Sequence, residues 1–179
     1  MLRGRRHERQ DERTGDGRVH YMMRQRLLSI GDDFWIETDT GERAYKVDGK
    51  ALRLRKTLVL ETPDGHKVAK IQEKMFRIKD AMEIEDAHGD RLAMVKKALF
   101  RPLRSHWSVE VANGADLEIH GNIVDHEYTF TDGRTKVAVV SKKWFRVADT
   151  YGVAIEPRQD PVVVLAATVA LDIMTHGGR

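Results

Sequence analysis

The sequence of 179 residues contains no cysteine, which excludes disulfide bonds and metal sites built from thiolates. Long hydrophobic runs are scarce. The longest extends from Val162 to Leu171, before Asp172, whereas a membrane-spanning helix needs about 20 apolar residues. A secretory signal requires an apolar stretch after a basic N-terminus, and no such stretch follows the basic N-terminus of this chain. We therefore expect a cytoplasmic protein that is not integral to a membrane, with peripheral attachment at a membrane left open.

A large excess of one charge is also lacking. The 31 basic and 28 acidic residues leave a formal net charge of +3. Much of that excess lies in the first eighteen residues, which contain Arg3, Arg5, Arg6, Arg9, Arg13 and Arg18. We predict that residues 1–20 form a disordered basic tail and that residues 21–179 form a single domain. Because the domain is nearly neutral, an anion-binding role requires local clusters of charge.

Apolar and polar residues alternate with a period of two along most of the chain, a pattern typical of strands with one buried face. Five turn sequences lie between such segments: Asp39-Thr40-Gly41, Pro63-Asp64-Gly65, His88-Gly89-Asp90, Asn113-Gly114 and Asp132-Gly133. Such turns favour antiparallel pairing of consecutive strands. The pattern predicts about twelve strands, at residues 27–30, 34–38, 44–48, 58–62, 68–73, 81–85, 92–98, 106–111, 117–120, 126–131, 136–142 and 151–156.

A repeat and a helix complete the predicted fold. Residues 44–54 are echoed 24 positions later by residues 68–78, and each unit holds only one hairpin. Hairpins joined edge to edge close into a barrel, which removes exposed strand edges. Near the C-terminus, Asp160 suits a helix N-cap, Pro161 the first helical position and Gly177 a C-terminal stop. The helix of about 16 residues between them is apolar on nearly every side and must be buried all round.

The predicted fold class is therefore mainly β: a closed antiparallel barrel of about twelve strands around a central C-terminal apolar helix. Asp172, an acid in this helix, is expected at the barrel end or in a hydrogen bond. With a helix inside the barrel, we expect function on its outside or its rims.

Seven short segments carry a family resemblance: MRQR at 23–26, FWI at 34–36, YKVDGK at 45–50, GNIVDHEY at 121–128, SKKWF at 141–145, DTYGV at 149–153 and VALD at 169–172. Over residues 21–175 the chain resembles the LURP-one-related family of the tubby C-terminal-like superfamily. The resemblance implies a twelve-stranded barrel around the C-terminal helix, and it implies little about activity. Related branches bind phosphoinositides (tubby) or are linked to phospholipid movement (scramblases), and none of their lipid-contacting residues is carried over to this chain.

A polar cluster at His120, Asp125, His126 and Glu127 is the best candidate for metal or acid–base chemistry. Strand alternation sends Asp125 and Glu127 to one face and His126 to the other. A hydrogen-bonded corner with a partly buried, satisfied His126 is therefore favoured over a metal site. Nucleophile and phosphate-loop motifs are absent, so we expect no enzyme, cofactor or metal. A small-ligand-binding protein or hydrolase with a barrel-end site around Asp125, His126 and Glu127 is the alternative.

Basic residues supply the candidate binding surface: Arg53, Arg55, Lys74, Lys96, Lys97, Lys142 and Lys143. A rim of such residues would attract lipid headgroups, although a solvated, charge-balanced barrel exterior is the simpler interpretation. The leading hypothesis is a non-catalytic binding or scaffold domain whose partner is an anionic membrane lipid or another protein. Nucleic-acid binding is not expected, because Trp35, Trp107 and Trp144 occupy positions that look inward rather than forming an exposed stacking platform.

Overall fold

The protein is described by a computed structural model that covers residues 17–24, 33–48, 57–73, 81–99, 105–145 and 149–176. Within these ranges twelve strands form one closed barrel in which each strand pairs antiparallel with its neighbours in the chain, and β1 pairs with β12. The strands are β1 (Val19–Arg24), β2 (Phe34–Thr38), β3 (Arg43–Asp48), β4 (Thr57–Glu61), β5 (Lys67–Glu73), β6 (Ala81–Glu85), β7 (Arg91–Leu99), β8 (Ser105–Val111), β9 (Leu117–Asn122), β10 (Glu127–Asp132), β11 (Thr135–Ser141) and β12 (Thr150–Ile155).

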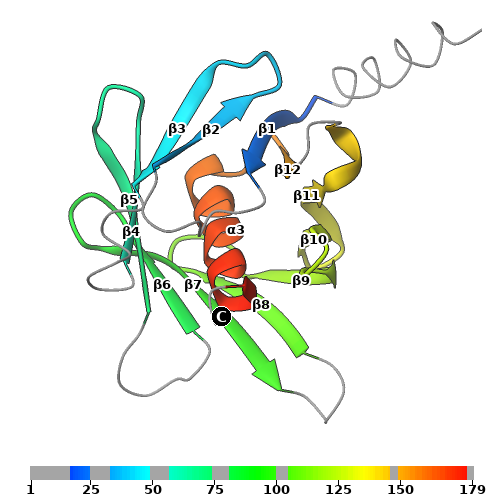
Figure 1. Ribbon diagram of the computed structural model, residues 1–179. Coiled ribbons are helices and arrows are strands. Elements are labelled where there is room, and N and C mark those ends of the chain that lie inside the picture. Colours follow the sequence, from blue (N-terminus) through cyan, green and yellow to red (C-terminus); the bar gives the residue numbers. More distant parts are fainter. Residues whose placement is uncertain are drawn as a thin grey trace, which may run out of the picture.

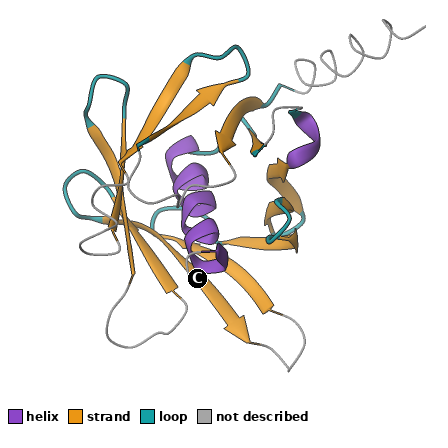
Figure 2. Ribbon diagram, viewed as in Figure 1, coloured by secondary structure: helices purple, strands orange, loops and turns teal. Residues whose placement is uncertain are grey.

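The helix α3 (Pro161–His176) runs through the middle of the barrel (Figure 1), with strands on all sides of it (Figure 2). Its start is capped as predicted, because Asp160 Oδ1 accepts a hydrogen bond of 2.8 Å from the Val162 amide. All residues from Val163 to Asp172 are buried. The predicted stop at Gly177 lies outside the described residues. None of the described helices is long and apolar enough to cross a membrane.

The barrel contains one strand that the alternation did not predict. The predicted strand at 27–30 lies outside the described residues, while β1 begins at Val19, inside the segment assigned to the tail. Tyr21 and Met23 are buried there, and pairing of β1 with both β2 and β12 closes the barrel. This strand is short and basic residues flank it in the sequence, so the alternation of apolar and polar residues did not identify it. The predicted tail is untested for residues 1–16, which lie outside the described residues.

Because neighbouring strands are antiparallel, all odd-numbered strands end at the same end of the barrel. We call this end the mouth. The helix α3 starts after β12 at the opposite end, among the five predicted hairpin turns, and ends at the mouth. The repeated units at 44–54 and 68–78 begin in β3 and β5, two strands that both end at the mouth.

Candidate functional site

Two adjacent lysines of the predicted basic surface point in opposite directions near the end of β7. Ala93 and Val95 are fully buried, so strand alternation also turns Lys97 inward and Lys96 outward. Lys96 Nζ pairs with Glu110 Oε1 at 2.5 Å. Lys97 Nζ instead lies 5.4 Å from the centre of the Trp107 ring, and no carboxylate of the described residues forms an ion pair with it. Of these two lysines, only Lys97 therefore faces the mouth without a carboxylate partner among the described residues.

Lys142 and Lys143 belong to the short helix η1 (Lys142–Trp144), which follows β11. Glu127 holds this helix: its carboxylate accepts hydrogen bonds from the Ser141 hydroxyl at 3.0 Å and from the Lys142 amide at 3.1 Å. Lys143 Nζ lies 3.6 Å from Glu127 Oε2 and its side chain is exposed. These lysines therefore do not line the groove that holds Lys97. Arg53, Arg55 and Lys74 lie outside the described residues.

A groove of about 960 Å³ opens at the mouth between α3 and the ends of β7, β8 and β9. Three basic side chains line it, Lys97, His106 and His120, of which His120 lies 3.2 Å from Glu118. The rest of the lining is mixed: Trp107, Ile119, Gly121, Asn122, Ile123, Val124, Met174 and Thr175. The groove thus joins one lysine and two imidazoles to an apolar floor. Sequence reasoning singled out Lys97 but not His106 or the floor that α3 contributes.

Asp125, His126 and Glu127 do not form the site that the alternative hypothesis required. Residues 123–126 form a turn and β10 begins only at Glu127, so the assumed strand alternation is wrong here. Asp125 is exposed and accepts a hydrogen bond of 2.6 Å from Asn122, while Glu127 holds η1. His126, with a left-handed φ of 53°, turns into the barrel and is fully buried. The three side chains therefore diverge.

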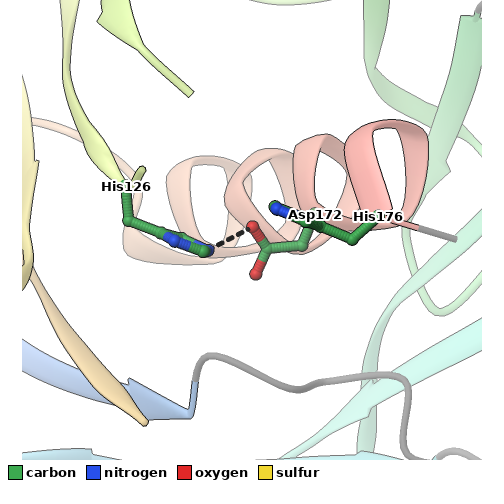
Figure 3. A group of neighbouring side chains, drawn as sticks. All are labelled: His126, Asp172 and His176. Atoms are coloured by element: carbon green, nitrogen blue, oxygen red, sulfur yellow. Dashed lines mark hydrogen bonds and ion pairs between the residues drawn. The ribbon is translucent and has the colours of Figure 1, made fainter. Parts of the chain in front are cut away.

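His126 instead meets the acid of the central helix (Figure 3). Its Nε2 lies 2.9 Å from Asp172 Oδ1, and the Tyr151 hydroxyl donates to Asp172 Oδ2 at 2.6 Å. The His126 ring stacks on Tyr151 with ring centres 4.2 Å apart. Asp172 is only 2% exposed, and a buried carboxylate needs such donors to offset its lost hydration. The expectation that Asp172 is hydrogen-bonded is confirmed, although its partners were not foreseen.

Two buried tyrosines surround this carboxylate. Burial first, and the nearby Asp172 carboxylate second, hold the pKa of Tyr151 and that of Tyr128 well above the ordinary value. Both hydroxyls therefore stay protonated at neutral pH. Tyr151 donates a hydrogen bond to Asp172, whereas among the described residues the Tyr128 hydroxyl and His126 Nδ1 have no hydrogen-bond partner of normal geometry.

A third polar residue of this cluster comes from the last turn of α3. His176 lies four residues after Asp172, and its ring is parallel to that of His126, with centres 5.4 Å apart. His126, Asp172 and His176 each offer one ligand atom, and these atoms all lie within 4.8 Å of one another. His126 and Asp172 are buried and His176 is exposed. Sequence reasoning did not select His176, although its spacing from Asp172 is that of neighbours on one helix face.

The tryptophans are also arranged differently from the prediction. Trp107 points inward, as expected. Trp35 lies half-buried on the outer face under the guanidinium of Arg43, 4.4 Å away, and Trp144 packs against Gly152 on the outside of β12. Trp35 and Trp144 therefore pack against residues on the outer face of the barrel and not in the core.

Comparisons with known proteins agree with this fold. The chain is 32% identical to the "Uncharacterized protein YxjI" of Bacillus subtilis (strain 168) over 66 residues, which cover 37% of this chain and 41% of that protein. The chain therefore matches well under half the length of this curated relative. A protein of Arabidopsis thaliana solved by X-ray crystallography superposes with a TM-score of 0.64, covering 87% of this chain and 90% of that one at 18% identity. Because the family model described as LURP-one-related matches residues 19–172, the chain belongs to the LURP-one-related family.

Proposed function

We propose that this domain is a non-catalytic binding domain that takes the anionic headgroup of a phospholipid at the mouth of the barrel. The observation that carries the proposal is the inward-facing Lys97, which lines the groove over the Trp107 ring without a carboxylate partner among the described residues. A cation in a partly enclosed groove interacts more strongly with a phosphate than one on an open surface, because water screens it less.

The remainder of the groove suits an amphiphile better than a free anion. His106 and His120 add donors beside Lys97, while Trp107, Ile123 and Met174 offer apolar surface. At the edge, Val124 is 59% exposed, as expected for a side chain that touches the interfacial layer of a bilayer. In this proposal the domain works in the cytoplasm, peripheral to the membrane.

The non-catalytic part of the proposal is supported by the hydroxyl groups around the mouth. Thr175 lines the groove beside His176, with its Oγ1 2.9 Å from His176 Nδ1. The same hydroxyl donates to the Leu171 carbonyl at 2.7 Å. Its proton is therefore directed to the helix backbone and not to a base, unlike the arrangement that activates a nucleophile.

The test is co-sedimentation with phosphatidylcholine vesicles, alone or with an added phosphoinositide or cardiolipin. We expect binding to the anionic vesicles only and, for Lys97→Gln, a loss of about fivefold, since one lysine near an anionic surface contributes about 1 kcal/mol. Lys96→Gln is the matched control because Lys96 faces outward and is already paired with Glu110.

Three outcomes contradict the proposal: equal binding to neutral vesicles, no binding at low salt, or equal losses for Lys96→Gln and Lys97→Gln. Absence of vesicle binding would leave a protein partner as the remaining version of a binding or scaffold role.

A further inference from the structure

We propose that His126, Asp172 and His176 bind a divalent transition-metal ion of the Zn²⁺ type. The three ligand atoms already lie within 4.8 Å of one another. Around a tetrahedral Zn²⁺, ligand atoms sit about 2.0–2.2 Å from the ion, which requires them to be somewhat over 3 Å apart. The 2.9 Å between His126 Nε2 and Asp172 Oδ1 is close to that separation, and exposed His176 has room to complete the set.

The donor set selects the class of metal. Two imidazole nitrogens and one carboxylate oxygen suit Zn²⁺ and its first-row neighbours, whereas Mg²⁺ and Ca²⁺ prefer sets made of oxygen alone. Three protein ligands would leave a fourth position for water or another small ligand. That position lies on the solvent side of the cluster, because His176 is exposed while His126 and Asp172 are buried.

Surrounding groups hold the two buried ligands in place. The Tyr151 hydroxyl binds Asp172 Oδ2, which leaves Oδ1 directed toward His126. The Tyr151 ring also stacks on the His126 imidazole and fixes its plane. A hydrogen bond to a ligating carboxylate and a fixed imidazole are features of metal sites in which surrounding residues orient the ligands.

The backbone at His126 gives a further reason to look for a ligand. Its φ of 53° is in the left-handed region, which costs a non-glycine residue free energy and recurs at functional sites. This conformation turns the imidazole inward toward α3. Bound metal would also neutralise Asp172, an acid buried in an otherwise apolar stretch of helix.

One feature limits the expected affinity. A His that ligates through Nε2 carries its proton on Nδ1 and usually donates it to a nearby acceptor. His126 Nδ1 is buried and has no such partner in the part of the chain that the structure describes. Loss of such a contact weakens metal binding by about 10–100-fold, so we expect a micromolar site rather than a nanomolar one.

The test uses the untagged full chain, stripped with EDTA and titrated with ZnCl₂ in a calorimeter and with CoCl₂ in an absorption spectrometer. We expect one ion per chain, a visible Co²⁺ band typical of low coordination number, and a Zn²⁺-induced rise in melting temperature that EDTA reverses. Because His176 is exposed, His176→Ala should keep the fold and weaken binding at least about 100-fold.

The matched control is His66→Ala. His66 and Asp64 form an exposed pair at 2.6 Å, at the end of the barrel away from the mouth. This variant therefore removes a His–carboxylate pair that has no third ligand among the described residues. It should bind Zn²⁺ like the unaltered chain. The proposal is wrong if His176→Ala binds Zn²⁺ as tightly as the unaltered chain, if both histidine variants lose affinity equally, or if neither ion binds at micromolar concentration.

Discussion

The two buried tyrosines beside Asp172 provide a matched pair for testing what stabilises the interior of the barrel. Tyr151 and Tyr128 are both almost fully buried, at 0% and 2% exposure. The Tyr151 hydroxyl donates a hydrogen bond to Asp172 Oδ2 at 2.6 Å, while the Tyr128 hydroxyl has no partner of normal geometry within the described ranges. Substitution by Phe removes one hydroxyl in each case and retains the ring.

The expected effects differ because only one of the two changes breaks a hydrogen bond. A hydrogen bond to a charged group contributes about 1.5–3 kcal/mol, and Tyr151→Phe leaves Asp172 with His126 as its remaining donor. We therefore expect Tyr151→Phe to lower the free energy of unfolding by about 1.5–3 kcal/mol. For a chain of this size that corresponds to a fall in melting temperature of about 3–12 °C. Tyr128→Phe should be neutral or slightly stabilising, because the buried hydroxyl that it removes makes only a contact of poor hydrogen-bond geometry, with Thr168, among the described residues.

The assay is urea denaturation followed by circular dichroism at pH 7, with EDTA present so that bound metal does not contribute. The slope of the free energy against urea should be the same for all three proteins, since the exposed surface on unfolding is unchanged. Equal losses of stability for both variants, or a larger loss for Tyr128→Phe, would refute the account of Asp172 given above.

Two further predictions concern pH and backbone geometry. The pKa values of Tyr128 and Tyr151 are raised in the folded state, so the unfolded chain loses these protons first, near pH 10. The free energy of unfolding should be unaffected below that pH and should fall above it by up to about 1.4 kcal/mol per pH unit for each tyrosine. Urea titrations from pH 8 to 11 measure this fall. The prediction is contradicted if Tyr128→Phe loses as much stability over this range as the unaltered chain. Gly121→Ala should prevent folding or cost several kcal/mol, because its φ is 124° and a Cβ would lie 2.5 Å from the Glu127 carbonyl oxygen. Gly133 has a φ of 57°, and a Cβ added there would meet nothing within 4 Å. Gly133→Ala should therefore cost only about 1–2 kcal/mol. Similar melting temperatures for the two alanine variants would count against this explanation.

Most of the barrel could be predicted from local patterns, because strand alternation and turn chemistry act over a few residues. Strands β2 and β6 begin and end at the predicted residues, and the cap at Asp160 is where the residue type placed it. The exception, β1, depends on pairing with β12 at the other end of the chain. Its apolar pattern is short and lies beside arginines, so local sequence alone does not identify it as a strand. Only its pairing with β12, which closes the barrel, explains why it forms.

Strand alternation predicts which way the residues of the basic surface point, but not what they face. Lys96 and Lys97 were grouped by charge, yet adjacent strand residues face opposite sides, and buried Val95 identifies the inward side. Their separation could have been predicted from the sequence. What could not be predicted is that Met174 and Thr175 of α3 form one wall of a groove at the mouth.

The His126, Asp172 and His176 cluster lies further beyond sequence reasoning, because it joins a turn to a helix 46 residues later. Asp125 and Glu127 were the obvious partners for His126 under a strand pattern, but the left-handed backbone at His126 breaks that pattern and reverses the direction of the side chain. The only local sign was the spacing of Asp172 and His176 on one helix face. An acid in an apolar helix must find donors wherever the helix is buried, so Asp172 itself was the strongest indication that polar residues from distant segments would converge at this depth of the barrel.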